Sequence, residues 1–203
     1  MTSSSSSRSV AVGALPGAEF LRFAEEHSFD PVDGTRIKSQ YSAALLSAAP
    51  ESGAIGLRGC GDLVAAASYG IVGLPQPNAV SARIDVVVTP PHCRGRGLAR
   101  AAVGTLLLRF IDQFADRLRH VSVVAAHPTI GRIVEALGFT DAKIGTKSPV
   151  LHRTIDDHTR VALRVDAEQL QSTTLRNLRT ECARCMWKRA APWCGRKGPV
   201  DGP

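Results

Sequence analysis

The chain lacks long apolar runs and is poor in aromatic residues. No apolar stretch approaches the roughly 18 residues that a membrane-spanning helix needs, and the longest candidate, Ala101 to Leu108, ends at Arg109. We therefore expect neither a membrane span nor a membrane partner. Aromatic residues make up only 5% of the chain, which argues against a surface that stacks nucleic-acid bases. No acidic cluster indicates a polycationic substrate such as an aminoglycoside.

The amino-terminal segment lacks the features of a secretory signal. Met1 to Ser9 is a serine-rich run without an early positive region, and Val10 to Leu15 is too short to form the apolar centre of a signal peptide. We expect residues 1–8 to be a disordered lead-in. We also expect the protein to be cytoplasmic.

Positive charge predominates, and arginine supplies most of it. The formal net charge is +7 over 203 residues. Arg accounts for 20 of the 25 basic residues. Arginine binds phosphate oxygens in a fixed fork geometry, so the balance favours a ligand with several phosphates, although genome composition gives the same bias.

The most informative stretch is Val86 to Ala99, VVVTPPHCRGRGLA. It indicates a β-branched strand, then a loop of Arg and Gly, then a helix from Leu98 to about Asp116. The first N–H groups of a helix lack partners within the helix and attract anions. Glycines 95 and 97 let the backbone approach an anion closely. The stretch therefore predicts a phosphate-binding loop.

The spacing in this loop identifies a family resemblance. It matches neither the lysine-containing P-loop nor the dinucleotide pattern. Arg94, Gly97 and Ala99 instead fill the pattern Arg/Gln-x-x-Gly-x-Gly/Ala, which resembles the acetyl-CoA pyrophosphate loop of the GNAT superfamily of N-acyltransferases. Leu137-Gly138-Phe139 resembles the closing Leu-Gly-Phe of the same family.

Periodicity and turn residues give an order of elements that matches this family. Helices are expected over 17–28, 35–48, 98–116 and 127–137, and strands over 9–12, 54–57, 62–71, 79–89, 121–125, 141–147 and 149–155. The resemblance implies an α/β (α+β) fold of GNAT type. Its mixed, mostly antiparallel central sheet is flanked by helices and splayed between the strands at 80–89 and 121–125.

The resemblance covers residues 9–156, which we expect to form the acetyltransferase domain. Residues 157–203 form a basic extension that is partly helical with a disordered end. From Thr159 onward it has nine basic and four acidic residues. Within it, Val161 to Val165 alternates and suggests a strand, and Asp166 to about Arg189 suggests a helix.

The resemblance also implies how acetyl-CoA, the co-substrate, is held. Backbone groups of the strand would bond the pantetheine arm, and N–H groups of the loop would hold the pyrophosphate. His127 stands where relatives have an Asn that contacts the arm, although capping of a helix or exposure to solvent fits it equally well. The expected cofactor-binding residues are Val86, Val87, Val88, Cys93, Arg94, Gly95, Arg96, Gly97, Leu98, Ala99 and His127.

For catalysis, Asp85 lies on the central strand where relatives often carry a Glu that takes the amine proton through water. Burial could raise its pKa and make it a general base, or it could bind a substrate ammonium or pair with Arg83. The Tyr that relatives use to protonate the leaving thiolate is replaced by Val134. A water molecule, Ser122 or Tyr69 could protonate the thiolate in place of that Tyr.

The five cysteines include residues that could bind a metal ion. Cys182 and Cys185 form a C-x-x-C and Cys194 follows, so three thiolates are available for zinc. His152 or His158 would have to supply a fourth ligand. Unligated thiols in a reducing compartment are the simpler interpretation, and we expect no metal. Cys93 fits a small filler better than a nucleophile.

Together these features predict an N-acetyltransferase that transfers acetyl from acetyl-CoA to an amine by direct attack. The acceptor is a small molecule or a protein amine, and the family leaves a homodimer open. Two alternatives remain: a non-catalytic acyl-CoA-binding module, supported by Val134, and a protein that binds a partner or nucleic acid through its basic tail.

Overall fold

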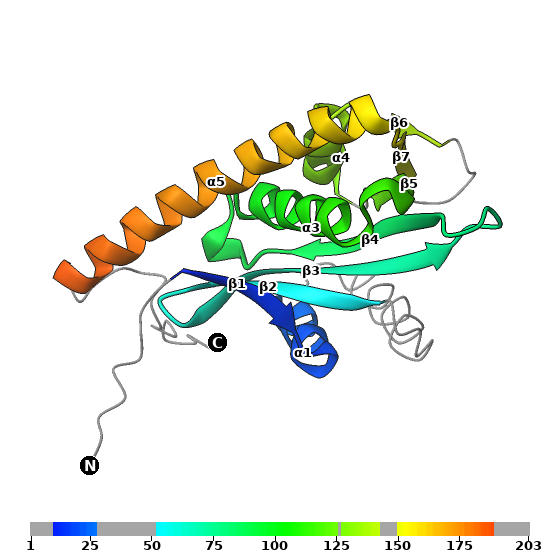
Figure 1. Cartoon of the computed structure of the whole chain (residues 1–203). Helices are drawn as coiled ribbons and strands as arrows, with labels where there is room; N and C mark the ends of the chain where they lie inside the picture. The colour runs from blue at the N-terminus through cyan, green and yellow to red at the C-terminus, as the bar shows by residue number, and fades with distance from the viewer. Residues whose placement is uncertain (1–9, 28–51, 126, 143–149, 189–203) are drawn as a thin grey trace, which may run out of the picture.

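A computed structural model describes residues 10–27, 52–125, 127–142 and 150–188, with side chains described as far as Glu181 (Figure 1). The elements in chain order are β1 Ala11–Leu15, α1 Gly17–His27, β2 Gly53–Gly59, β3 Asp62–Gly73, β4 Val80–Val88, a 3-10 turn η1 Pro91–Cys93, α3 Leu98–Phe114, a 3-10 turn η2 Ala115–Arg117, β5 Leu118–Val124, α4 Pro128–Glu135, β6 Thr140–Asp141, β7 Val150–Thr154 and α5 Asp157–Lys188.

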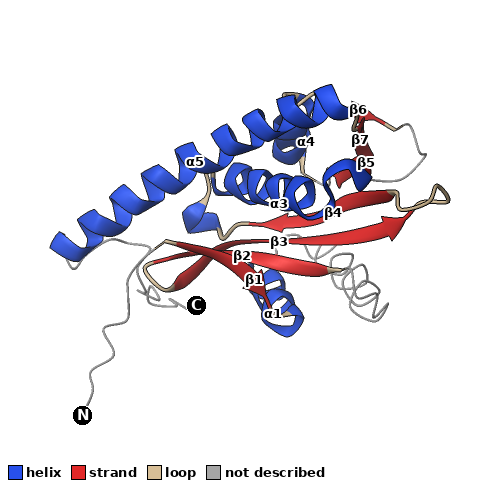
Figure 2. Ribbon diagram, viewed as in Figure 1, coloured by secondary structure: helices blue, strands red, loops and turns tan. Residues whose placement is uncertain are grey.

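The strands form one seven-stranded sheet in the order β1-β2-β3-β4-β5-β7-β6 (Figure 2). Every neighbouring pair is antiparallel except β4 with β5, which run parallel. Parallel neighbours need a crossover between them, and α3 supplies it. The β4–β5 pairing ends at Ile84 and Val123. The predicted mixed sheet, splayed between these two strands, is confirmed.

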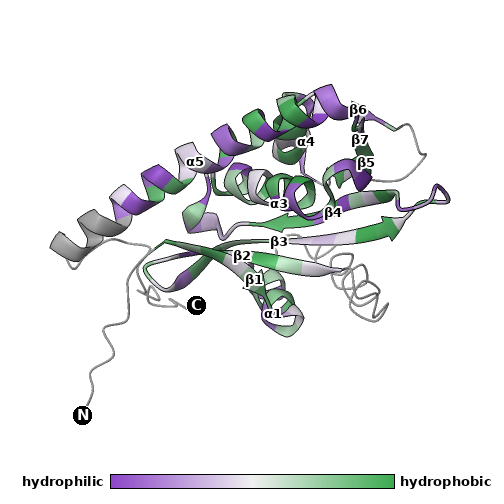
Figure 3. Ribbon diagram, in the orientation of Figure 1, coloured by the Kyte–Doolittle hydropathy of each residue, from purple (hydrophilic) through white to green (hydrophobic). Residues whose placement is uncertain are grey.

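Helices cover both faces of the sheet, and a hydrophobic core lies on each. Helices α3, α4 and α5 lie on one face, and α1 lies on the other (Figure 1). The larger core joins the α3 side chains Leu106, Leu107 and Phe110 to the strands. The smaller core joins Phe20 and Phe23 of α1 to the opposite face. Figure 3 shows hydrophobic residues along β3 of the sheet and along α3, which lies between the sheet and α5.

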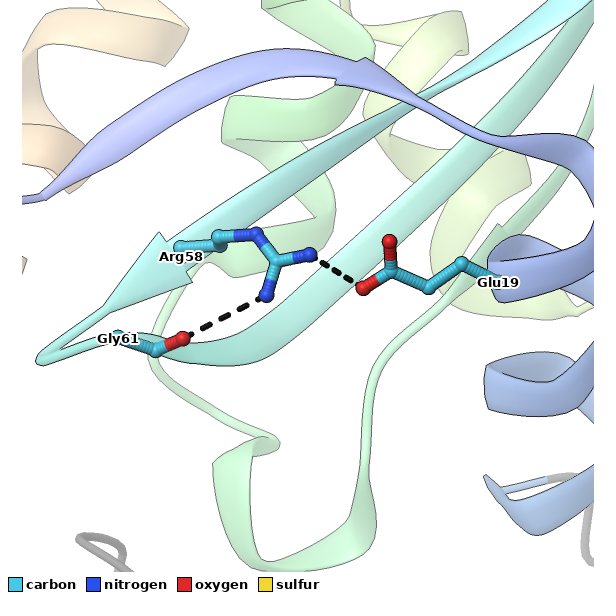
Figure 4. Close-up of polar contacts among 3 residues, drawn as sticks. All are labelled: Glu19, Arg58 and Gly61. Atoms are coloured by element: carbon cyan, nitrogen blue, oxygen red, sulfur yellow. Dashed lines mark hydrogen bonds and ion pairs between the residues drawn. The ribbon is translucent and has the colours of Figure 1, made fainter.

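The β2–β3 connection is the tight hairpin that the glycines predict. Cys60 and Gly61 have φ angles of 55° and 95°, the positive values that a two-residue hairpin turn requires. Arg58, next to the turn, donates to the Gly61 carbonyl at 3.5 Å and pairs with Glu19 of α1 (Figure 4). This contact ties α1 to the hairpin across the sheet face, although half-exposed pairs add little stability.

The carboxyl-terminal helix α5 corrects one prediction. Val161 to Val165 is part of this helix and not a strand. The alternation was misleading because both valines face solvent, at 66% and 58% exposed, whereas Leu163 and Ala167 are fully buried. With Thr174 and Leu178, which are also buried, they recur at helical spacing along one face.

Helix α5 packs closely along α3 in the opposite direction. Arg164 pairs with Asp112 near the end of α3, and Gln171 donates to Thr105 at 2.9 Å. At Gly104, next to Thr105, an added Cβ would lie 2.7 Å from the Ala167 carbonyl oxygen. The two backbones therefore approach each other at a position where only glycine fits.

We predict that Gly104→Ala destabilises the protein by about 1–3 kcal/mol, because overpacking must push α5 away from α3. The measurement is the midpoint of urea unfolding. Gly73→Ala is the matched control, since nothing lies within 4 Å of a Cβ built at Gly73. Equal midpoints for the two variants would show that α5 is not held against α3 in this way.

Other expectations are confirmed with shifted bounds or fall outside the described residues. The first strand is 11–15, two residues later than expected, and β6 spans only Thr140–Asp141. Strand β5 buries Val121 and Val123 but leaves Ser122 and Val124 half-buried, so it is not covered fully on both faces. The helix at 35–48, the lead-in at 1–8, residues 143–147 and the end of the tail lie outside the described residues. No described helix is long and apolar enough to cross a membrane.

Candidate functional site

Strand β4 carries a β-bulge at Asp85. Tyr69 of β3 pairs with Ile84, but the preceding Ser68 pairs with Val86, so Asp85 has no partner of its own in the register. A bulge reverses the alternation of side chains along a strand and redirects the residue at the bulge. Ile84 therefore faces the α3 core, while Val86 faces the α1 core.

Asp85 lies buried on the α1 face, with a carboxyl group that is only half satisfied. Its exposed fraction is 9%. One oxygen, Oδ1, accepts from Nε of Arg83, whereas Oδ2 is buried without a hydrogen-bond partner among the described residues. Burial raises the pKa of Asp85 above its usual value, and the neighbouring Arg83 charge opposes the rise. A carboxylate with a raised pKa can accept a proton from a substrate.

Beyond the bulge, β4 separates from β5. Val86, Val87 and Val88 keep their pairing with β3 but have no partner on β5, because the pairing between β4 and β5 stops at Ile84 and Val123. The backbone on this edge is therefore open to a ligand that adds as a strand would. The valine side chains pack into the two cores, so core packing and backbone binding coexist here.

The loop after β4 leads into the amino-terminus of α3. The N–H groups of Cys93 and Arg94 donate to Pro90 and Pro91 within η1, so these two amides serve the turn. The first helical bond runs from Ala101 to the Gly97 carbonyl, and no side chain caps Gly97. The amides of residues 98–100 therefore have no acceptor within the helix, and an anion can bind there.

The two loop glycines have different surroundings. Both have a φ of 76°, in the left-handed region. No atom of the described residues lies within 4 Å of a Cβ built at Gly95, whereas a Cβ at Gly97 would lie 2.9 Å from Oγ1 of Thr174 on α5. Gly95 thus faces open space, and Gly97 is fitted against the helix.

Helix α5 also contacts the loop through polar side chains. Glu181 accepts from Arg96 at 2.8 Å, and Thr174 donates to the Gly97 carbonyl at 3.3 Å. Arg96, a predicted phosphate ligand, is therefore already paired with a carboxylate. Cys93 lies buried in the same loop, and burial raises the pKa of its thiol, so it is a poor nucleophile.

His127 forms the amino-terminal cap of α4. Its Nδ1 accepts from the N–H of Thr129 at 3.1 Å, and its side chain is exposed. The two simpler roles expected for it, capping of a helix and exposure to solvent, are therefore both displayed by the described residues. Its predicted contact with the pantetheine arm stays a prediction.

The two candidate catalytic residues lie on opposite faces of the sheet. The Tyr69 ring packs edge-on against Phe110 of α3 at 5.6 Å between centroids, and Arg109 lies over it. Asp85 faces the α1 side. Val134, which stands where the sequence resemblance implies a Tyr, is fully buried in the α3 core. The structure thus separates Tyr69 from Asp85.

We predict that Tyr69→Phe changes kcat for acetyl transfer by less than about twofold, because its ring packing is kept and its hydroxyl lies away from Asp85. The rate of acetyl-CoA-dependent acetylation measures this. A loss of about 100-fold, the scale of a missing acid or base, would instead return Tyr69 to the site as the leaving-group acid.

Local sequence patterns missed several neighbours of this site. His27 at the end of α1 lies 6.4 Å from His92 of η1 between ring centroids, and burial lowers the pKa of His27. Thr174 and Glu181 reach the loop from about 80 residues away in the sequence. No local spacing signals such contacts.

Among the described residues, no cluster of three His, Cys, Asp or Glu side chains could hold a metal ion. The side chains of Cys182 and Cys185, and all of Cys194, lie outside the described residues. Their predicted availability for zinc therefore stays a prediction.

No protein-family model and no curated protein matches the chain in sequence. Solved structures match its fold. An acetyltransferase assigned to the GNAT family from Desulfovibrio desulfuricans is 18% identical, covers 73% of this chain and all of its own, and has a TM-score of 0.53. The ribosomal-protein-S18-alanine N-acetyltransferase from Escherichia coli is 15% identical, with 72% and 94% covered and a TM-score of 0.52.

A third match, AtaTR bound with acetyl-CoA, is 10% identical, covers 80% of this chain and 98% of its own, and has a TM-score of 0.53. These similarities show that the chain has the GNAT fold. The resemblance seen in the sequence is confirmed at the level of the fold.

Proposed function

We propose that this GNAT-fold chain transfers an acetyl group from acetyl-CoA to an amine. One observation carries the proposal: a buried, half-satisfied carboxyl group at Asp85 lies on β4 where this strand leaves β5, and the same strand ends in the loop that opens α3. A base, an open strand edge and an anion site thus follow one another along 80–100. The fold neighbours, two of which are named as acetyltransferases, support this chemistry.

The residues present fit acetyl-CoA, which supplies an activated acetyl thioester when bound. The uncapped amides of residues 98–100 and the open side of Gly95 suit a pyrophosphate. The free edge of Val86 to Val88 suits the amides of the pantetheine arm. AtaTR, with the same fold, binds acetyl-CoA. Arg94 and Arg100 would add positive charge, and His127 would contact the arm.

Asp85 would remove the proton from the acceptor amine, directly or through a water. A bond forms between the amine nitrogen and the acetyl carbonyl carbon, and the carbon–sulfur bond breaks. The amine proton passes to Asp85, and the leaving thiolate takes a proton from solvent. Val134 and the position of Tyr69 support solvent as the proton source, because neither side chain offers an acid next to Asp85.

Val134 also supports the alternative of a non-catalytic acyl-CoA-binding module. Calorimetry of the full chain with acetyl-CoA, followed by release of free thiol in the presence of an amine panel, separates the two. Binding with amine-dependent thiol release supports the enzyme, and binding without release supports the module. If acetyl-CoA and longer acyl-CoAs do not bind, both proposals fail.

A further inference from the structure

Three polar side chains on the described residues approach the position that a Cβ would occupy at Gly70 on β3. A Cβ built at Gly70 would lie 3.6 Å from Oγ of Ser52, 3.7 Å from Oδ2 of Asp85 and 3.9 Å from NH2 of Arg83. We call this point, with its three neighbours, the Gly70 site. It lies on the α1 face of the sheet, beside the bulge that holds Asp85.

Two features of the Gly70 site favour a ligand there. Within the part of the chain that the structure describes, Oδ2 of Asp85 is buried and has no hydrogen-bond partner, an arrangement that costs free energy unless a ligand or water completes it. A glycine inside a long strand also costs stability and often marks the close approach of another group. At Gly70 the missing side chain leaves the position of a methyl group beside Oδ2, at ordinary contact distance.

The charges at the site are of opposite sign. Asp85 presents an acceptor with negative charge to a substrate amine. Arg83 uses Nε for Asp85, and its NH2 faces the same point. The Arg83 side chain is 49% exposed, so its outer nitrogens can reach a second, anionic group. Guanidinium and carboxylate groups match in geometry.

We propose that the acceptor is a free α-amino acid, a molecule whose amine and carboxylate are joined through one carbon. The amine lies at Oδ2 of Asp85 and the carboxylate lies on Arg83. Ser52 donates its hydroxyl hydrogen to the same carboxylate. This inference rests on the proposed acetyltransferase function and specifies its substrate.

The same geometry disfavours two other classes of amine. A polyamine brings a second positive charge next to Arg83 and is repelled. A protein amino-terminus has a neutral peptide carbonyl where the free amino acid has its carboxylate, so it offers the outer nitrogens of Arg83 no second anionic group.

The test is a panel of L-amino acids and their α-carboxamides, with the full-length chain and acetyl-CoA. The readouts are thiol release and the mass of the acetylated product. For at least one pair, the acid should exceed its amide in kcat/KM by about tenfold or more, because the neutral amide cannot form the charge-assisted hydrogen bonds that a carboxylate forms with the outer nitrogens of Arg83. Amides accepted as well as acids, or activity on protein amines alone, would overturn the proposal.

Two variants test whether the preference for the acid over the amide arises at the Gly70 site. Arg83→Gln should remove the acid-over-amide ratio, and this ratio is the informative quantity because Arg83 also affects Asp85. Gly70→Ala fills the site at ordinary contact distances and should raise KM for the amino acid by about tenfold without changing acetyl-CoA affinity. Gly73→Ala, on the same strand with nothing within 4 Å of its added Cβ, should match the native chain.

The outcomes separate this inference from the proposed function. If acetyl-CoA binds but neither Arg83→Gln nor Gly70→Ala changes the choice of acceptor, the amino-acid site is wrong and the acetyltransferase proposal stands. If acetyl-CoA does not bind the native chain, the proposed function fails first.

Discussion

Replacing Gly95 by aspartate is expected to weaken acetyl-CoA binding by about 100-fold or more, which corresponds to about 2.7 kcal/mol. The residue lies in the loop before α3 with a φ of 76° and with open space where a side chain would project. Aspartate tolerates this left-handed conformation better than most residues. Its carboxylate would meet the pyrophosphate at the helix amino-terminus, where like charges repel. Calorimetry measures the loss.

The matched control is Gly95→Asn, which has nearly the same shape and conformational tolerance but no charge. It should keep acetyl-CoA affinity within about fivefold of the native chain. Gly97 is unsuitable for this test, because a side chain there meets Thr174 and would disturb the contact with α5. Equal losses in both Gly95 variants would point to a steric effect, and no loss in either would place the pyrophosphate elsewhere.

The Asp85→Asn substitution is expected to lower kcat for acetyl transfer by about 10²–10⁴-fold, the usual contribution of a general base. The amide keeps the shape of the side chain but cannot take the amine proton. Acetyl-CoA affinity should stay unchanged, since the phosphate loop and the free edge of β4 are intact. Steady-state rates, with calorimetry as the control for binding, test this prediction.

The pH dependence gives a second, independent readout of Asp85. Because burial raises its pKa, the protonated and inactive form persists to a higher pH than for an exposed aspartate. The native kcat/KM should therefore fall as the pH drops through this raised pKa, and Asp85→Asn should lack that acidic limb. An acidic limb that persists in Asp85→Asn would assign it to another group.

The raised pKa of Asp85 also determines how this residue changes the stability of the fold with pH. A group whose pKa is higher in the folded state stabilises the fold when protonated, at low pH, and this contribution is lost as the pH rises through the folded-state pKa. Ionised Asp85 is therefore a cost at neutral pH, which its contact with Arg83 partly offsets. A large loss of stability in Asp85→Asn would contradict this balance.

The sequence predicts the loop and its flanking elements because their signals are local. Gly95 and Gly97 precede an apolar helix, and the β-branched run before them indicates a strand. The bulge at Asp85 could not be predicted in this way. It depends on how β4 pairs with β3, and the residues near 85 carry no spacing that marks an extra residue.

Helix α5 is a second case in which local sequence patterns do not predict the structure. Apolar residues alternate with others from Val161 to Val165, and this alternation suggests a strand. The buried residues Leu163 and Ala167 define a helical face only once α3 is known to cover them. The pair between Arg96 and Glu181 joins segments far apart in sequence. Such contacts arise from tertiary packing, which overrides local propensity.

The central claim is that this chain moves acetyl groups from acetyl-CoA to an amine. The most direct measurement is thiol release from acetyl-CoA by the native chain, with and without a panel of L-amino acids, other small-molecule amines and protein amines, beside Gly95→Asp. The account predicts amine-dependent release with a stoichiometric N-acetylated product, and none from the variant. Tight binding of acetyl-CoA without amine-dependent release would contradict it and leave an acyl-CoA-binding module.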